Sequence, residues 1–367
     1  MIWRCDMVPQ YLQFRDDILK AMDRVMHSGR YILAEEVSAF EREFSDYLGG
    51  GHAVGLANAT DALTLCLRAF DVGPGDEVIT TPYTAIPTLS AIIDSGAKPV
   101  FVDIDPDTYL LDIQAVCQHI TERTKAVVPV HIFGNVLDVH RLRSMIGPKI
   151  VVIEDAAQAH GSTFRGQKAG TMGDAGVFSF YPTKNLGGYG DGGAAVCSDP
   201  ETSSKLRLLR MYGMIDKDQI CMHGVNSRLD ELQAAVLRIK LPHLDDMNRR
   251  RNQIAERYAA ELSFDLFRQQ VIPSGVFSNY HVHVARFLGD RDAFVSHMDR
   301  AGIQTNIYYV LPLHLQAACS GLGGIQGQFP NAEALCDQAI ALPMYPELPD
   351  ATVDAIIKAA NSFVSHD

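Results

Sequence analysis

The chain has little that would suggest a membrane protein, a secreted protein or a zinc protein. No apolar run approaches the ~20 residues that a membrane-spanning helix needs, and the first residues, which include Arg4 and Asp6, form no signal peptide. The seven cysteines are an odd number, and none forms a CxxC pair or a Cys/His spacing typical of zinc. We therefore expect a soluble, cytoplasmic protein with reduced thiols, no membrane association and no metal site.

Basic residues are also in deficit. The 32 Lys and Arg residues are outnumbered by 44 Asp and Glu residues, which makes the formal net charge −12. Proteins that bind nucleic acid in general carry a basic face, so this balance predicts no nucleic-acid partner. It does not exclude an anionic small molecule, since a few local donors can dominate one pocket. With 47% hydrophobic and 21% charged residues, the 367-residue chain has ordinary globular composition and predicts about two domains.

The hydrophobic pattern predicts an α/β fold. The first fifty residues are expected to be helical, with Val37, Phe40 and Phe44 on one face. Strand-like and helix-like segments then alternate, which favours a mostly parallel sheet covered by helices on both faces. The expected strands are residues 53–57, 77–81, 99–103, 126–132, 150–154, 176–180 and 194–198, and the expected helices are 60–70, 86–94, 112–120 and 137–145.

The last third predicts a smaller α+β unit. Residues 229–262 form a long helical pattern whose basic run, Arg249 to Arg251, is interpreted as a solvated helix face. Alternating residues at 281–287 and 304–310 indicate strands. We predict a large domain at 1–240 and a small C-terminal domain at 241–367.

Three motif-like segments are set aside. Residues 188–193 match GxGxxG, but a strand follows these glycines where a dinucleotide site needs a helix. Residues 103–107 resemble the start of a calcium loop, but Thr108 and Gln114 occupy the positions that need Gly and Glu. His281 and His283 share a strand face without a third metal ligand in view.

Three other segments predict one site together. The strand before Asn58 runs through Asn58 and Ala59 into a helix that opens at Thr60 and Asp61, and the free N–H groups of its first turn would bind a phosphate. Asp155 follows a buried strand and would need a cationic partner. Ser179 precedes a glycine-rich loop in which Lys184 could be desolvated, with a lowered pKa and a nucleophilic amine. Each segment alone has an ordinary explanation: Thr60 as a helix cap, Asp155 as the cap of a turn, and Lys184 as a solvated loop lysine. In combination they favour pyridoxal 5′-phosphate.

These segments resemble the DegT/DnrJ/EryC1/StrS sugar aminotransferases, and the resemblance covers nearly the whole chain. The most specific matches are EDAAQAHG at 154–161 and FSFYPTKN at 178–185. Others lie at residues 28–33, 36–41, 57–63, 101–105, 130–134, 224–234 and 312–316. The resemblance implies fold type I, like aspartate aminotransferase: a large domain with a mixed, mostly parallel seven-stranded sheet and a small C-terminal domain.

The same resemblance implies roles for the cofactor site. Lys184 would be the catalytic Schiff-base lysine and proton carrier, and Asp155 would keep the pyridine nitrogen protonated. Gln158 would bond the ring hydroxyl, and Tyr83 would stack on the ring. The phosphate would be bound by Ala59, Thr60 and Ser179, and by Asn226 of a neighbouring subunit, which implies a homodimer with shared active sites.

Four residues are implied to lie near cofactor or substrate: His160, Tyr189, Arg228 and His314. An ordinary structural role remains an equal alternative for the two histidines and for Tyr189. The presence of Lys184, where dehydratases of the family carry histidine, favours transamination.

The implied reaction moves an amino group from L-glutamate to a nucleotide-linked (dTDP or UDP) keto-deoxy sugar in amino-sugar biosynthesis, with pyridoxamine 5′-phosphate formed between the two halves. Asp191 stands where many members that aminate C4 carry Glu, so C3 is favoured and C4 is the alternative. Val310 stands where Pro is usual in the substrate region, and Ala59 stands where Gly is commoner in the phosphate turn, so both places depart from the family's pattern. A non-catalytic, cofactor-binding regulatory protein is the other alternative.

Overall fold

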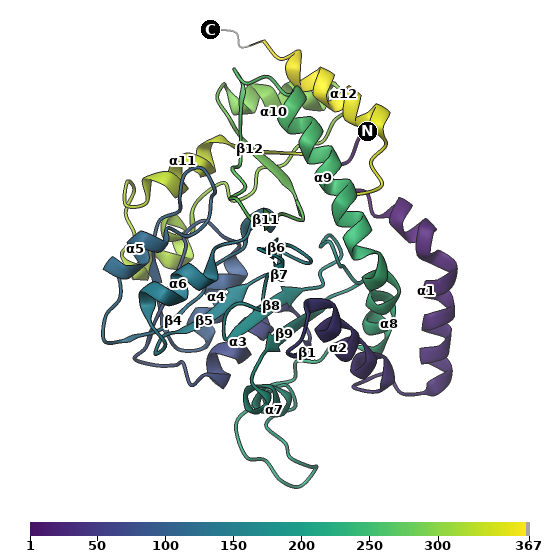
Figure 1. The fold of residues 1–367 in the computed structure, drawn as a ribbon, viewed down its shortest axis with the longest axis vertical. Coiled ribbons are helices and arrows are strands. Elements are labelled where there is room, and N and C mark those ends of the chain that lie inside the picture. The colour runs from purple at the N-terminus through teal and green to yellow at the C-terminus, as the bar shows by residue number, and fades with distance from the viewer. Residues whose placement is uncertain (365–367) are drawn as a thin grey trace.

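The computed structural model describes residues 1–364 and begins with two helices, α1 (Val8–Ser28) and α2 (Glu35–Leu48). Helix α1 buries one stripe of side chains, including Phe14, Ile18 and Val25, and lies along α8 at the edge of the molecule (Figure 1). Helix α2 buries Phe40 and Phe44. It ends at Gly49, whose φ of 91° is a left-handed conformation that favours glycine.

The central sheet contains the seven strands that the sequence predicts. They are β1 (His52–Leu56), β2 (Glu77–Thr80), β3 (Lys98–Phe101), β4 (Thr124–Val127), β5 (Val151–Asp155), β8 (Ala175–Ser179) and β9 (Gly193–Cys197). Their order is β1-β9-β8-β5-β4-β2-β3, and only β9 runs antiparallel to its neighbours within this sheet. The predicted mixed, mostly parallel α/β sheet is confirmed.

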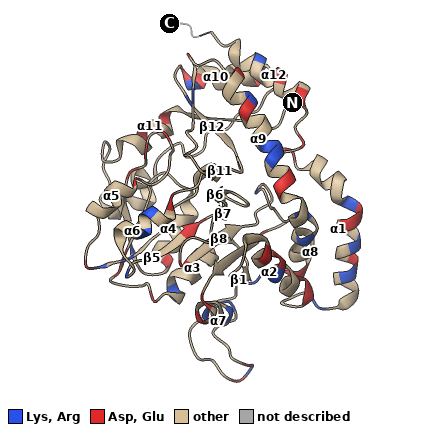
Figure 2. Ribbon diagram, viewed as in Figure 1, with Lys and Arg blue, Asp and Glu red and all other residues tan. Residues whose placement is uncertain are grey.

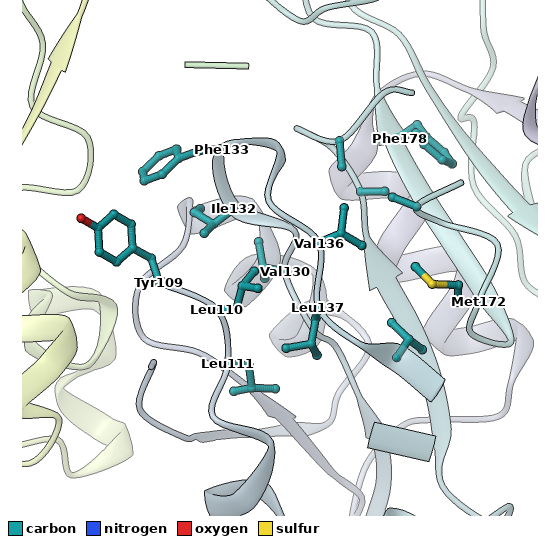
Figure 3. Close-up of a cluster of buried hydrophobic side chains, with 14 of the residues drawn as sticks. Tyr109, Leu110, Leu111, Val130, Ile132, Phe133, Val136, Leu137, Met172 and Phe178 are labelled. Carbon is teal, nitrogen blue, oxygen red and sulfur yellow. The ribbon is translucent and has the colours of Figure 1, made fainter. Parts of the chain in front are cut away.

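Alternate residues of each strand enter two different hydrophobic cores. On one face, residues such as Ile153 and Val177 pack with α3 (Ala59–Ala69), α4 (Ile86–Asp94) and α7 (Pro200–Leu209). On the other face, Val152 and Phe178 join a core that includes α2, α5 (Ile113–Gln118) and α6 (Val139–Ile146). Figure 3 shows part of this second core, with Phe178 and Met172 on one side and Phe133 and Tyr109 on the other. Both faces of the sheet are therefore covered, as the continuous apolar strands predict.

The C-terminal third is a smaller α+β unit with its own core. Its sheet has the order β10-β12-β13, and a further small sheet has the order β11-β6-β7. The bounds of the remaining strands are β6 (Thr163–Phe164), β7 (Gln167–Lys168), β10 (Phe267–Gln269), β11 (Val276–Phe277), β12 (His283–Phe287) and β13 (Ala339–Leu342). The remaining α-helices are α8 (Glu231–Lys240), α9 (Leu244–Glu261), α10 (Arg291–Arg300), α11 (Pro330–Gln338) and α12 (Asp350–Asn361), and 3₁₀ turns lie at Ile132–Gly134, Leu241–His243, Leu313–Leu315 and Ala317–Leu322.

Three expectations for this part of the chain are wrong in detail. The helical pattern at 229–262 is two helices, because Pro242 lacks an N–H and stands in a 3₁₀ turn between α8 and α9. Residues 304–310 form no strand, and Asn306 pairs with Ala341 only as an isolated bridge. Arg251 does not belong to a solvated face, since it is buried and donates to backbone carbonyls of His281 and Met344.

The domain boundary at residue 240 stays a prediction. The extreme N-terminus joins the C-terminal unit, because Ile2 pairs with Ile303 and Cys5 packs on the same core. All seven cysteines are free thiols. Within the described part of the chain, no helix is both long and apolar enough to cross a membrane. Figure 2 shows residues of both charge signs along α1 and α9, whereas the central strands are mostly uncharged.

Candidate active site

A cavity of about 280 Å³ opens where the parallel strands end. Strands β1, β2, β5 and β8 all lead into segments that line it, as ligand sites of open α/β sheets do. The lining residues are Asn58, Ala59, Thr60, Leu63, Thr84, Ala85, Pro87, Thr88, Val130, Asp155, Ala157, Gln158, Ser179, Tyr181, Lys184, Asp191 and Gly192.

The amino-terminal end of α3 forms one wall of this cavity. The side chain of Asn58 caps the helix by accepting a hydrogen bond from the Asp61 N–H at 2.8 Å. The N–H groups of Ala59 and Thr60 have no acceptor among residues 1–364, so they are free to bind an anion. Gly193 allows strand β9 to approach this turn, because a Cβ there would lie 2.4 Å from the Asn58 carbonyl carbon.

Asp155, the last residue of β5, is held by two hydrogen bonds. Its Oδ2 accepts from the Thr88 hydroxyl at 2.8 Å, and its Oδ1 accepts from the Ala157 N–H at 3.2 Å. The buried hydroxyl of Thr88 also lies 3.0 Å from that of Thr84. These contacts fix the carboxylate in one orientation at the cavity wall.

Lys184 lies in the loop between β8 and β9. Its N–H donates to the Tyr181 carbonyl at 2.9 Å, and a turn forms around it. Burial disfavours the charged ammonium and lowers the pKa of Lys184 to about 8, although the negative charge of Asp155 acts in the opposite direction. The loop is anchored by Lys240, whose buried Nζ donates to the Gly187 carbonyl at 2.8 Å. An amine with a lowered pKa therefore faces a fixed carboxylate, as the sequence predicts.

Gln158 is held on the opposite side of the cavity by partners from two other segments. Its Oε1 accepts from the Phe133 N–H at 2.7 Å, and its Nε2 donates to the Tyr309 hydroxyl at 3.0 Å. The rings of Phe133 and Tyr309 stack with centroids 6.1 Å apart. This arrangement couples the cavity to the segment after residue 303, in which Tyr309 has a φ of 62°.

Most of the predicted cofactor residues come together here. The cavity is lined by Ala59, Thr60, Asp155, Gln158, Ser179 and Lys184. Tyr83 is the exception, and its expected place on the cofactor ring is corrected. It is fully buried, with its ring edge-on to Tyr309 at 5.2 Å, and Ala85 lines the cavity instead. The chain leaves β2 at Thr80, and the side chain of Tyr83 turns from there into the core.

The predicted substrate residues lie outside the cavity. His160 is buried between Phe178 and Phe180, and burial lowers its pKa to about 3. His314 is also buried, and its Nε2 lies 3.1 Å from Glu333 Oε1. Within residues 1–364, neither ring nitrogen of His160 has a hydrogen-bond partner, and Nδ1 of His314 has none, so their roles near cofactor or substrate stay predictions.

The other two predicted substrate residues, and Asn226, lie towards the surface. Tyr189 packs on Tyr11 and under Lys240, and Arg228 points at Met211. Asn226 is exposed on the long loop after α7, which extends from the body at the bottom of Figure 1.

Sequence reasoning missed the two threonines that support Asp155. Thr84 and Thr88 are four residues apart around the start of α4, a spacing that places both hydroxyls on one side of the turn. Their position just after β2, at the same sheet edge as Asp155, is the feature of the sequence that could have indicated their place in the site.

The donor set fits a planar phosphate ester with a basic ring nitrogen. The free N–H groups of Ala59 and Thr60 suit a phosphate, and the fixed carboxylate of Asp155 suits a protonated pyridine nitrogen. The Lys184 amine suits a carbonyl carbon. Together these residues match pyridoxal 5′-phosphate, and Tyr181 and Asp191 also line the cavity.

Known proteins resemble this chain along its whole length. The model of the DegT/DnrJ/EryC1/StrS aminotransferase family matches residues 13–361. The "Pleiotropic regulatory protein" of Geobacillus stearothermophilus is 41% identical over 364 residues, which cover 98% of each chain. A dTDP-3-amino-3,4,6-trideoxy-alpha-D-glucose transaminase of Micromonospora megalomicea subsp. nigra is 42% identical, with 97% of each chain covered.

A solved structure gives the same result. The crystal structure of S. venezuelae DesV superposes with a TM-score of 0.94 at 40% identity and covers 98% of this chain and 97% of its own. Enzymes of the matched family are aminotransferases that use pyridoxal 5′-phosphate. This cofactor is the one that the donor set of the cavity fits. The family match, the two relatives and the shared fold show that the chain belongs to the DegT/DnrJ/EryC1/StrS aminotransferase family.

Proposed function

We propose that this protein transfers an amino group from L-glutamate to the C3 keto group of a nucleotide-linked keto-deoxy sugar. The observation that carries this proposal is the Lys184 amine, with its pKa lowered to about 8, opposite the fixed carboxylate of Asp155. The C3 position is supported by the Micromonospora relative, which is named as a 3-amino-sugar transaminase, and by Asp191, which lines the cavity. The alternative position is C4.

Each lining residue has a definite task in such a reaction. Bound pyridoxal phosphate supplies a ring that accepts electrons from the reacting carbon. Lys184 Nζ, when neutral, would hold the cofactor through its carbonyl carbon and, once free, would accept and return the proton of the reacting carbon. Asp155 holds the proton of the ring nitrogen, while Thr88 and Ala157 keep its oxygens in place. The α3 terminus binds the phosphate, and Gln158 orients the ring.

A homodimer is part of the proposal. Helix α1 exposes Val8, Leu12, Leu19 and Met26, and the loop after α7 exposes Ile215 and Ile220. Apolar surface of this extent is typical of an interface. Asn226 is exposed on the same loop and does not line the cavity of its own chain. We infer that the loop delivers Asn226 to the phosphate in the partner's site.

The test begins with the visible absorbance of protein reconstituted with pyridoxal phosphate. We expect L-glutamate to remove this band, and a dTDP- or UDP-linked 3-keto sugar to restore it with release of the 3-amino sugar. Lys184→Ala should lack the band, whereas Lys205→Ala, a surface lysine paired with Asp71, should keep it. If the reconstituted protein has no band, the proposal fails. If only 4-keto sugars are aminated, the C3 assignment is replaced by C4.

A regulatory role is the second candidate, because one relative is named a pleiotropic regulatory protein. A non-catalytic protein would have no need for a lysine whose amine is kept partly neutral. Turnover with any keto sugar would remove this candidate as the sole function. Cofactor binding without conversion of any amino acid or keto sugar would favour it.

A further inference from the structure

A second, smaller cavity of about 20 Å³ lies beside the Lys184 loop. It is enclosed by the N-terminal segment, the residue before Lys184 and the C-terminal unit. The lining residues are Arg4, Cys5, Thr183, His281, Val282, Asn306, Tyr308, Ala341, Leu342 and Met344. A space of this size accepts about one water molecule or a comparably small polar group.

The guanidinium of Arg4 is the main charged group of this cavity. Its Nη1 donates to the Tyr308 hydroxyl at 2.9 Å, which fixes its direction. Within residues 1–364 no carboxylate lies within 4 Å of it, and its side chain has no second hydrogen-bond acceptor. Arginine is otherwise well suited to hold a carboxylate by two parallel hydrogen bonds.

The surroundings of Arg4 add positive charge without compensating it. Arg251 is buried nearby and binds only backbone carbonyls, those of Tyr280, His281 and Met344. Glu347 is the acidic group that faces Arg251, but it forms no ion pair with it within 4 Å, and burial raises its pKa. The cavity therefore presents one cation, Arg4, and the hydroxyl-bearing residues Thr183 and Tyr308 to any group that enters it.

His281 connects this cavity to the catalytic lysine. Its buried ring lines the cavity, and its Nδ1 lies 3.1 Å from Oδ1 of Asn185, the residue after Lys184. Burial lowers the pKa of His281 well below its usual value, and the charges of Lys184, Arg251 and Arg4 act in the same direction. The imidazole is thus neutral and lies within the fields of both Lys184 and Arg4. An anion bound at Arg4 would lie beside the loop that carries Lys184.

We propose that Arg4 binds a carboxylate of the amino-acid donor, with Tyr308 as its positioning residue and the Thr183 hydroxyl as a further donor. The proposal rests on the proposed function and deepens it. An amino-acid donor must present its amine where Lys184 reacts, and its carboxylate then needs a cation nearby. Arg4 lines the cavity beside the Lys184 loop and, among residues 1–364, has no carboxylate partner within 4 Å. Asp155, by contrast, would repel a carboxylate from the other side.

The experiment uses the reconstituted holoenzyme and follows the loss of visible absorbance with increasing L-glutamate. Arg4→Gln should raise the glutamate concentration for half-maximal rate about 10- to 100-fold, the value of one charged hydrogen-bonded pair. Arg4→Lys should recover part of this loss. The initial spectrum and the KM for the keto sugar should not change. Arg15→Gln, an exposed residue paired with Asp16, is the matched control.

Tyr308→Phe tests whether Arg4 binds the donor's carboxylate or only holds Tyr308 in place. If Arg4 served only to hold Tyr308, this variant would match Arg4→Gln. We expect a smaller effect, because the guanidinium remains. Equal effects of the two variants, or a keto-sugar KM that rises as much as the glutamate value in Arg4→Gln, would overturn the proposal.

Calorimetric titration with glutarate, a dicarboxylate without an amine, distinguishes the two proposals. Glutarate binding that is lost in Arg4→Gln supports the carboxylate site even if no amino acid reacts, in which case only the proposed function fails. Reaction with glutamate that is unaffected in Arg4→Gln overturns the site and leaves the function. Neither reaction nor glutarate binding in the wild type overturns both.

Discussion

At the residue scale, the chemistry depends on how far each side chain is removed from water. Lys184 and His160 are both buried, and burial lowers the pKa of each because it disfavours the charged form. For Lys184 this leaves an amine that is half neutral near pH 8, whereas His160 is neutral throughout the physiological range. The sequence predicts the lowered pKa of Lys184 from its glycine-rich loop, and in the structure the burial of the side chain acts in that direction.

The rate of cofactor attachment should therefore depend on pH. Because the pKa of Lys184 lies at about 8, below the value near 10.4 of a solvated lysine, the neutral amine is scarce at pH 6.5 and predominant by pH 9. We expect the rate at which the visible band appears, after cofactor-free protein is mixed with pyridoxal phosphate, to rise with a midpoint near pH 8. A rate still rising steeply at pH 10 would contradict the burial of Lys184.

The charge of Asp155 provides the control for this pH profile. Asp155 raises the pKa of Lys184, so Asp155→Asn should move the midpoint to lower pH. The midpoint is the quantity to compare, since the amplitude also reflects weaker cofactor binding. An unchanged midpoint would show that the carboxylate does not act on the amine.

The sequence places Asp155 and Ser179, which directly end a strand, but it does not place the side chains of the segment after β2. Asp155 and Ser179 end β5 and β8, so strand position alone places them at the sheet edge. Tyr83 and Thr88 follow β2 by several residues, where the alternation of side chains no longer applies. Their directions depend on how α4 packs, and this explains why Tyr83 was assigned to the ring and Thr88 was overlooked.

At the element scale, the beginning of α2 depends on a side chain from a distant helix. Ala34 precedes α2 and offers no side-chain cap. Glu231, buried at the start of α8, accepts hydrogen bonds from the N–H groups of Ala34, Glu36 and Val37 at 2.7 to 3.1 Å. Such a cap cannot be inferred from local sequence, because nearly 200 residues separate donor and acceptor. Local patterns did predict the seven strands, whereas the break at Pro242 and the burial of Arg251 depend on tertiary packing.

Glu231→Gln should destabilise the protein measurably. A glutamine side chain has only one oxygen that can accept hydrogen bonds. Its NH₂ group would face a backbone N–H, so one buried N–H donor would be left without an acceptor. We expect the free energy of unfolding to fall by about 2 kcal/mol, measured by urea denaturation of the cofactor-loaded protein. The neighbouring exposed carboxylate of Asp230 forms no side-chain hydrogen bond to its helix, so Asp230→Asn should change stability by less than about 0.5 kcal/mol. Equal losses in both variants would mean that Glu231 does not act as a cap.

At the scale of the whole molecule, net charge and local binding chemistry are independent. The chain carries a net charge of −12, and residues of both signs lie along the outer helices (Figure 2). The proposed ligands are nevertheless anions, a phosphate ester and an amino acid. They are to be bound by helix-terminal N–H groups, hydroxyls and a few cations such as Arg4. The exposed apolar residues on α1 and on the loop after α7 are a second whole-molecule property, and they support the proposed dimer.

If Asn226 completes the partner's site, two inactive variants should restore each other's activity when mixed. Lys184→Ala has no reactive amine, and Asn226→Ala cannot bind the partner's phosphate. In a mixed dimer one site combines the intact Lys184 of one chain with the intact Asn226 of the other. Random exchange makes half of the dimers mixed and restores one site in each, so about a quarter of wild-type turnover should return. Turnover of keto sugar after unfolding and refolding together measures this, and separately refolded variants are the control. Full activity of Asn226→Ala alone, or no recovery in the mixture, would show that each chain holds a complete site.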